Sequence, residues 1–245
     1  MTDSLLEVSA LRKTYGDKVV LDDIDLTVQP HDVICLIGSS GPGKSTLLRC
    51  LNLLEEIDDG VIRFEGREIS DPRVDRRAVR SRMGMVFQAY NLFPHMSVLD
   101  NCTLSPRRVH GVPKAEAEVR ARDLLTRFGL ADQAGKHPDR MSGGQQQRAA
   151  LVRALCTQPT LLLLDEITAA LDPELVGEVL TIVRELADQG TTMILATHEM
   201  AFARDIATTV CFLDGGRVLE HGPPAEIFSS PREERTRRFL ARVLG

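Results

Sequence analysis

The sequence predicts an α/β fold with a mostly parallel sheet at its centre, and three observations favour this class. Residues 33–37 are all apolar and are followed by a glycine, which is typical of a strand buried on both faces. In the second half of the chain, short apolar runs of β type alternate with helical patterns, as they do when right-handed crossovers join parallel strands. Residues 90–155 are mainly helical in pattern and interrupt this alternation, which indicates a helical subdomain inserted in a single domain of residues 1–245.

The predicted elements follow one another along the chain. Residues 5–9 and 19–28 form two strands, the second with apolar residues at alternate positions. A glycine-rich loop follows strand 33–37 and leads into a helix over residues 45–54. The remaining elements are helices 114–127, 144–156, 174–189 and 201–208 and strands 161–164, 192–196, 210–213 and 217–220, the last two joined by Asp214-Gly215-Gly216.

Composition and charge exclude several classes of protein. The chain is 43% hydrophobic and 27% charged, an ordinary globular balance. No apolar run approaches the roughly 18–20 residues that span a bilayer, and the first residues lack the features of a signal peptide, so we expect a cytosolic protein. Five scattered cysteines without a CxxC pair argue against a disulfide framework and a zinc site. The net charge of −5 argues against a nucleic-acid partner.

Five arginines between residues 73 and 82 are a local exception to the acidic balance. Such a cluster can be a solvated helix face, or it can contact phosphates or lipid headgroups. We favour the solvated helix face, because runs of like charge on a helix are commonly exposed to water.

Residues 38–45 carry the first motif with chemical content. The string Gly-Ser-Ser-Gly-Pro-Gly-Lys-Ser matches the phosphate-binding pattern G-x-x-x-x-G-K-[ST], and it stands between a buried strand and a helix, as the motif requires. Lys44 supplies charge to the β- and γ-phosphates, and the Ser45 hydroxyl can bind Mg²⁺. Pro42 has no N–H, so we expect a weaker phosphate grip. The predicted nucleotide contacts here are Gly38, Ser39, Ser40, Gly41, Pro42, Gly43, Lys44, Ser45 and Thr46.

Two acidic residues, Asp165 and Glu166, follow the four leucines of predicted strand 161–164. Ligands gather at the carboxyl ends of parallel strands, so these carboxylates can face the phosphate loop. Asp165 would then hold Mg²⁺, mostly through water, and Glu166 would orient or deprotonate the attacking water. The alternative is that both acids cap the next helix, and it is disfavoured because that helix begins near residue 174.

A second anion-binding device is predicted at residues 141–148, Met-Ser-Gly-Gly-Gln-Gln-Gln-Arg. Small residues there lead into a helix, whose N-terminus accepts anions, and Ser142 adds a hydroxyl donor. The two devices could face one nucleotide within a chain, or they could face each other across a two-fold dimer.

The whole chain resembles the ATP-binding-cassette (ABC) ATPases. Besides the phosphate loop and the acidic strand end, the resemblance rests on Tyr15, Gln88, the signature Ser142-Gly143-Gly144-Gln145, Asp172 and His198, in the family's order. It implies a P-loop NTPase (RecA-like) core with an antiparallel β subdomain and an inserted helical subdomain at about 90–155. It also implies ATP and Mg²⁺ as ligands and a head-to-tail homodimer, with each ATP between one phosphate loop and the partner's signature.

The resemblance assigns roles that suit the chemistry of the residues. Tyr15 can stack on adenine. Gln88 can reach both Mg²⁺ and the attacking water, and His198 can contact the γ-phosphate and Glu166, so both join Glu166 as catalytic residues. Asp172 is expected at the dimer seam, and it can also cap the helix that begins at Pro173. The other histidines are expected to be incidental: His31, His95, His110, His137 and His221.

One segment departs from the family pattern. Ile167-Thr168-Ala169 stands where the family commonly has Pro-Thr-Ser, so a hydroxyl that could form a hydrogen bond near the seam is lost at Ala169. The acid, glutamine and histidine remain, and we therefore still expect ATP hydrolysis.

Residues 87–96, 171–180 and 231–240 resemble the importer ATPases for polar amino acids. This branch implies a two-fold membrane permease as partner, a solute-binding protein that feeds it, and a peripheral place on the cytoplasmic side of the membrane. Residues 90–96 mix aromatic residues with a proline and could dock the permease or simply pack in the core. A soluble ABC ATPase of DNA repair or translation is the alternative, although such proteins usually carry two cassettes or a long coiled coil. A regulatory module without hydrolysis is disfavoured by Glu166 and His198.

Overall fold

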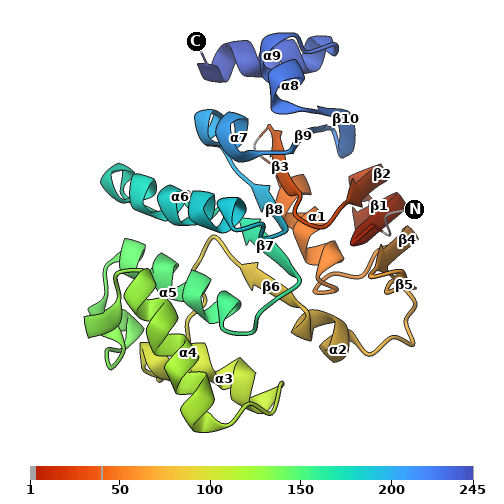
Figure 1. The fold of residues 1–245 in the computed structure, drawn as a ribbon. Helices are drawn as coiled ribbons and strands as arrows, with labels where there is room; N and C mark the ends of the chain where they lie inside the picture. Colours follow the sequence, from red (N-terminus) through yellow and green to blue (C-terminus); the bar gives the residue numbers. More distant parts are fainter. Residues whose placement is uncertain (1–3, 40, 245) are drawn as a thin grey trace.

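Two sheets with helices around them make up the fold in the computed structural model, which describes residues 4–39 and 41–244 (Figure 1). An antiparallel sheet has the order β2-β1-β4-β5, and a larger sheet has the order β10-β9-β3-β8-β7-β6. The strands are β1 (Leu6–Tyr15), β2 (Lys18–Val28), β3 (Val33–Gly38), β4 (Asp59–Phe64), β5 (Arg67–Glu68), β6 (Met83–Val86), β7 (Leu161–Asp165), β8 (Met193–Ala196), β9 (Thr209–Asp214) and β10 (Arg217–Gly222). The predicted α/β class and the antiparallel β subdomain are confirmed.

Helices cover the larger sheet, and three of them stand apart at its β6 edge (Figure 1). The helices are α1 (Gly43–Leu51), α2 (Arg76–Ser81), α3 (Val98–Arg108), α4 (Lys114–Arg127), α5 (Gly143–Leu155), α6 (Pro173–Asp188), α7 (Met200–Ile206), α8 (Pro224–Ser229) and α9 (Glu234–Leu244), with short 3-10 turns at Ala131–Gln133 and Pro138–Arg140. Helices α3, α4 and α5 pack on one another in the region predicted to be inserted. None of the helices in the described ranges is long and apolar enough to cross a membrane.

Strand β3 divides the core into two clusters because it is buried on both faces. Cys35 and Ile37 belong to the cluster that includes residues of helices α3 to α7, whereas Ile34 and Leu36 belong to the cluster that includes α1 and the antiparallel sheet. This double burial is what the continuous apolar run predicts.

The strand order brings four loops to one edge of the larger sheet. Strands β3, β8, β7 and β6 are parallel neighbours, so their carboxyl ends lie side by side. The residues that follow those ends are the phosphate loop, His198, the acidic pair and Gln88. The fold therefore collects on one edge the residues that the sequence separates by more than 100 positions.

The predicted first strand is too short. Strand β1 continues to Tyr15, but its pairing with β2 shifts register after Val8 and again before Thr14. Ala10 lies in the left-handed region with φ 49°. Each bulge interrupts the alternation of inward and outward side chains, so a period of two residues no longer marks the strand beyond residue 9.

All five cysteines are buried free thiols. Burial raises the pKa of the Cys50 thiol and of the Cys211 thiol to about 12, which keeps both unreactive. The arginine cluster also agrees with its interpretation as a solvated surface. Helix α2 buries none of its residues, and Arg76 pairs with Glu56 at 2.6 Å.

Candidate functional site

The phosphate loop joins β3 to α1. Gly38 has φ 147°, and a Cβ built on it would lie 2.0 Å from the Leu213 carbonyl oxygen, so only glycine fits there. Pro42 precedes α1 with φ −72°, a value that its ring favours. The predicted contact Ser40 lies outside the described residues. A cavity of about 270 Å³ opens beside the loop and is lined by Lys18, Val19, Val20, Ser39, Gly41, Pro42, Gly43, Lys44, Leu213, Asp214, Gly215 and Gly216.

Lys44 is 1% exposed and directs its ammonium back over the loop. Its Nζ donates to the Ser39 carbonyl at 3.2 Å and to the Gly38 carbonyl at 3.5 Å. The carboxylate oxygen Oε1 of Glu166 lies 3.5 Å from the same nitrogen. A buried ammonium that is held mainly by neutral carbonyls is well placed to receive phosphate oxygens.

The acidic pair takes up two different positions. The Oδ1 atom of Asp165, at the end of β7, accepts a hydrogen bond from the Ser45 hydroxyl at 2.6 Å. Burial raises the pKa of Asp165, and the bond from Ser45 opposes this shift only in part. A hydroxyl and a carboxylate at this spacing suit Mg²⁺, which needs only one or two protein ligands when substrate phosphates supply others. No cluster of three metal-binding side chains occurs in the described residues, and such a site does not require one.

Glu166 connects the lysine to the histidine. His198 Nε2 lies 3.0 Å from Glu166 Oε1, the same oxygen that faces Lys44. Glu166 has φ 44°, a strained conformation for a residue with a side chain, and its N–H donates to the Ala196 carbonyl at 3.0 Å. Strain of this kind costs about 1–3 kcal/mol and is found mostly at functional sites. Such a carboxylate, held between the Lys44 ammonium and the His198 ring, is placed to accept a proton from water.

Two predicted residues stay outside this cluster. Gln88 is exposed just beyond β6, and within the described ranges its side chain has no hydrogen-bond partner. Tyr15 is 43% exposed, and Lys13 Nζ lies 5.0 Å from its ring centroid. Tyr15 pairs across the β1–β2 hairpin with Lys18, and Lys18 lines the cavity beside the phosphate loop.

The signature segment forms a capping box at the N-terminus of α5, which was not predicted from the sequence. Ser142 Oγ accepts the N–H of Gln145 at 3.3 Å, and the Gln145 side chain accepts the N–H of Ser142 at 3.0 Å. A Cβ on Gly143 would lie 2.8 Å from the Tyr90 hydroxyl, and one on Gly144 would lie 3.0 Å from the Leu175 side chain. Across the described residues, no hydrogen bond joins this segment to the phosphate loop of its own chain.

Asp172 caps α6, as one of its two predicted roles requires. Its carboxylate accepts the N–H of Glu174 at 3.2 Å, and Pro173 fills the first helical position. Its role at a dimer seam stays a prediction. In the nearby segment that departs from the family pattern, Ile167 is buried in the core and Ala169 is exposed.

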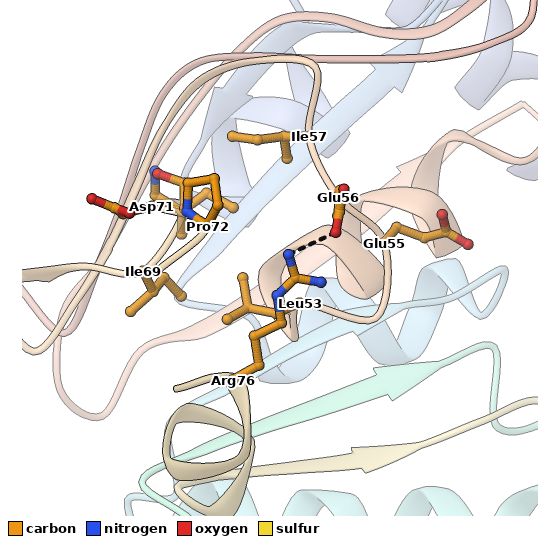
Figure 2. Close-up of a pocket in the computed structure, with 10 residues that line it drawn as sticks. Leu53, Glu55, Glu56, Ile57, Ile69, Asp71, Pro72 and Arg76 are labelled. Carbon is orange, nitrogen blue, oxygen red and sulfur yellow. Dashed lines mark hydrogen bonds and ion pairs between the residues drawn. The ribbon is translucent and has the colours of Figure 1, made fainter. Parts of the chain in front are cut away.

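A second cavity, of about 110 Å³, collects none of the predicted site residues (Figure 2). Its walls include Leu53, Ile57 and Ile69, and the ion pair between Arg76 and Glu56 lies among the lining residues. Arg76 of the arginine cluster therefore lines this cavity and is paired with Glu56.

Asp165→Asn is expected to raise the melting temperature of the nucleotide-free protein at pH 7. In a domain of this size, each 1 kcal/mol of added stability raises the melting temperature by about 2–4 °C. Because burial raises the pKa of Asp165 above its value in the unfolded chain, the ionised carboxylate costs stability at neutral pH. The gain should shrink as the pH falls toward the ordinary pKa of aspartate and vanish below it, where the carboxyl group is protonated in both the folded and the unfolded state. Thermal melts over a pH series test this, with the exposed Asp123→Asn as control. A lower melting temperature at neutral pH would contradict the assigned cost.

Comparison with known proteins agrees with this geometry. The ABC transporter family profile matches residues 21–169. The chain is 48% identical to the glutamine transport ATP-binding protein of Geobacillus stearothermophilus, over 96% of this chain and 97% of the relative. It is 47% identical to the L-cystine import ATP-binding protein of Bacillus subtilis, over 98% and 99%. A dimeric ATP-binding cassette solved in a post-hydrolysis state with ADP and Pi superposes with a TM-score of 0.81 at 28% identity, over 89% of this chain and 98% of the other.

Proposed function

Because this chain belongs to the ABC transporter family and is one of its ATPases, we propose that it is the ATP-hydrolysing subunit of a bacterial-type importer of polar amino acids. The observation that carries this proposal is full-length identity of 46–48% to ATP-binding proteins of glutamine and cystine transport. Those names favour transport over the DNA-repair or translation type. The protein would lie on the cytoplasmic side of the membrane, held there by its permease.

The residues around the phosphate loop divide the chemistry of hydrolysis. Lys44 and the loop amides would bind the β- and γ-phosphates, and Ser45, Gln88 and Asp165 would hold Mg²⁺, Asp165 mostly through water. The ion would neutralise phosphate charge. Glu166 would take a proton from the attacking water. His198, whose Nε2 lies 3.0 Å from that carboxylate, would orient it and contact the γ-phosphate.

A second copy of the chain would complete the site. The N-terminus of α5, with Ser142 to Gln145, forms its polar contacts within the segment and leaves the helix end free for a partner's γ-phosphate. Tyr15 would stack on adenine, and Asp172 would lie at the seam. Helices α3 to α5, within the region 90–155, would form the subdomain that carries this signature.

Residues 90–96 are the proposed permease contact, and the fold holds them rigidly at the surface. The side chain of Asn101 is 1% exposed, accepts the Phe93 N–H at 2.8 Å and donates to the carbonyls of Phe93 at 3.1 Å and Ser97 at 3.0 Å. Phe93 is nonetheless 43% exposed, and its ring lies 6.0 Å from that of His95. Leu92 packs against the core and anchors the segment, while Phe93 is left exposed at the surface, where a partner could contact it.

Reconstituted transport tests the proposed function. The vesicles contain the wild-type chain, the permease encoded with it and the matching solute-binding protein. They should take up labelled glutamine, cystine or another polar amino acid when ATP is supplied. Vesicles with Lys44→Ala should not. Active ATP hydrolysis without uptake of any amino acid in the panel would contradict an amino-acid importer and leave the ATPase assignment intact.

Phe93→Asp is expected to reduce co-purification with the permease by at least tenfold and to leave the basal ATPase rate within about twofold, since a charge in a desolvated contact costs on the order of 1.4 kcal/mol or more. Leu219→Asp is the matched control, because Leu219 is a similarly exposed apolar residue (37%) on β10, far from α3 (Figure 1). Unchanged co-purification would remove residues 90–96 from the interface. A large fall in melting temperature would instead assign Phe93 to the core.

A further inference from the structure

Asp214 lies between the phosphate loop and the C-terminal helix α9 and contacts both. Its Oδ1 atom accepts a hydrogen bond from the Ser39 hydroxyl at 2.7 Å. Arg235 of α9 donates from Nε to Oδ2 at 2.8 Å and from Nη2 to Oδ1 at 3.2 Å, a two-pronged ion pair. The Ser39 carbonyl in turn accepts from Lys44 Nζ at 3.2 Å. A continuous line of polar contacts therefore runs from α9 to the phosphate-binding lysine.

The position of α9 does not depend on that ion pair alone. The rings of Phe239 and Phe212 lie 5.2 Å apart, which packs the helix on β9. Glu220 of β10 accepts the N–H of Arg232 at 2.7 Å just before the helix begins. These contacts hold the first turn of α9, and with it Arg235, over the β9–β10 turn.

The placement of Arg235 is unfavourable for the helix itself. It is the second residue of α9, where the helix dipole favours acidic side chains, and a cation there weakens the helix. Asp214 compensates for this charge from outside the helix. An arginine at this point is therefore better explained by the carboxylate it reaches than by helix stability.

Asp214 also needs a counter-charge, because it lines the same cavity as Ser39 and Lys44. A free carboxylate on that wall would repel the phosphates of a nucleotide. The hydrogen bond from Arg235 is the main cause that lowers the pKa of Asp214, the bond from Ser39 adds to it, and burial opposes both. The carboxylate is thus ionised at neutral pH and is neutralised by Arg235.

We propose that Arg235 is a positioning residue for the phosphates of ATP, acting through Asp214 on Ser39 of the phosphate loop. The ion pair fixes the Asp214 carboxylate where it can hold the Ser39 hydroxyl, and it cancels the charge that would otherwise face the phosphates. The C-terminal helix is in this way part of the nucleotide site. The inference rests on the ATP site proposed above.

Binding and turnover of Mg-ATP by the purified full chain test the proposal. Arg235→Ala should raise both Kd and KM for ATP about tenfold and change kcat less than twofold, because it leaves a carboxylate without its partner. Arg235→Lys should restore most of the affinity. Adding Asp214→Asn to Arg235→Ala should also restore it, since the amide keeps an acceptor for Ser39 and removes the charge. Arg238→Ala is the matched control, because Arg238 pairs with Glu234 within the same helix.

The outcomes separate the possible explanations. If Arg235→Ala leaves Kd and KM unchanged while Lys44→Ala abolishes binding, the inference fails and the ATP site stands. If Lys44→Ala also binds normally, the proposed site itself fails. If the double variant is as weak as Arg235→Ala or weaker, the pair only fastens α9, and the positioning role is overturned. Should Arg235→Ala not fold, Arg235→Gln and the double variant carry the same comparison.

Discussion

Replacing Lys44 by alanine is expected to lower the affinity for ATP at least about thirtyfold. The ammonium is buried, faces two loop carbonyls and lies 3.5 Å from Glu166, so it is the cation nearest to the place where phosphates would enter. Without it, the Glu166 carboxylate would face the phosphates uncompensated. Loss of one partner in such a desolvated set costs about 2–5 kcal/mol, and each tenfold in affinity corresponds to about 1.4 kcal/mol.

Calorimetric titration with Mg-ATP measures this effect directly. Lys114→Ala serves as the control, because Lys114 is an exposed lysine at the start of α4 whose partner is Glu118 at 3.6 Å. A thermal melt in the absence of nucleotide separates lost binding from lost folding. An affinity within threefold of wild type in a folded Lys44→Ala protein would overturn the assignment of the phosphate loop.

The sequence predicted best the elements whose burial is uniform or whose period is regular. Residues 33–37 and 161–164 match β3 and β7 closely because both faces of each strand are buried and every residue is apolar. The predicted helix 114–127 has the bounds of α4, because its buried residues recur on one face of an otherwise charged helix.

For helices with irregular backbones or few side chains in the core, the sequence did not predict the bounds. Helix α3 contains Pro106, and a proline inside a helix is disfavoured because it lacks an N–H, so the sequence pattern does not predict a helix there. Helix α1 stops at Leu51, whereas residues 45–54 were predicted to be helical, because Leu53 turns into the left-handed region with φ 53°. Helix α2 buries no residue, and therefore has no apolar period from which its bounds could be read.

The motifs in the sequence predicted which residues form the site. The order of the strands in the sheet determines which of those residues lie next to one another. Nothing local in the sequence says that β8 lies between β3 and β7, yet that order brings His198 to 3.0 Å from Glu166. The line from Arg235 through Asp214 to Ser39 was not predicted at all. Ser39 and Asp214 are 175 positions apart, and a serine, an aspartate and an arginine form no recognisable motif at such spacing.

The Glu166→Gln variant is expected to lower the rate of ATP hydrolysis by about 10²–10⁴-fold, the usual contribution of a positioned general base. Glutamine has the same shape, so it can keep the hydrogen bond to His198 and adopt the same left-handed backbone at no added cost. It carries no charge, and Lys44 would lose its anionic neighbour at 3.5 Å and become more available to phosphate. Bound ATP should therefore persist, and its affinity should not fall.

Persistent ATP should hold two copies of the chain together. The N-terminus of α5 is the proposed second anion-binding element. In the described part of the chain no hydrogen bond joins it to its own phosphate loop, and across a two-fold axis it could cover the partner's γ-phosphate. Light scattering after gel filtration should find Glu166→Gln as a dimer with ATP and a monomer without it, while wild type dimerises only transiently. Glu199→Gln is the control, because this nearby carboxylate faces Thr168 at 3.5 Å and should keep normal turnover.

A second change tests whether the dimer depends on the signature. Ser142→Arg, placed in the Glu166→Gln background, should prevent the dimer by filling the space for the partner's phosphate, while each monomer still binds ATP. A Glu166→Gln protein that stays monomeric at saturating ATP would contradict the shared site. Turnover at the wild-type rate in that protein would instead take the role of general base away from Glu166, because no proton could then be passing to that side chain.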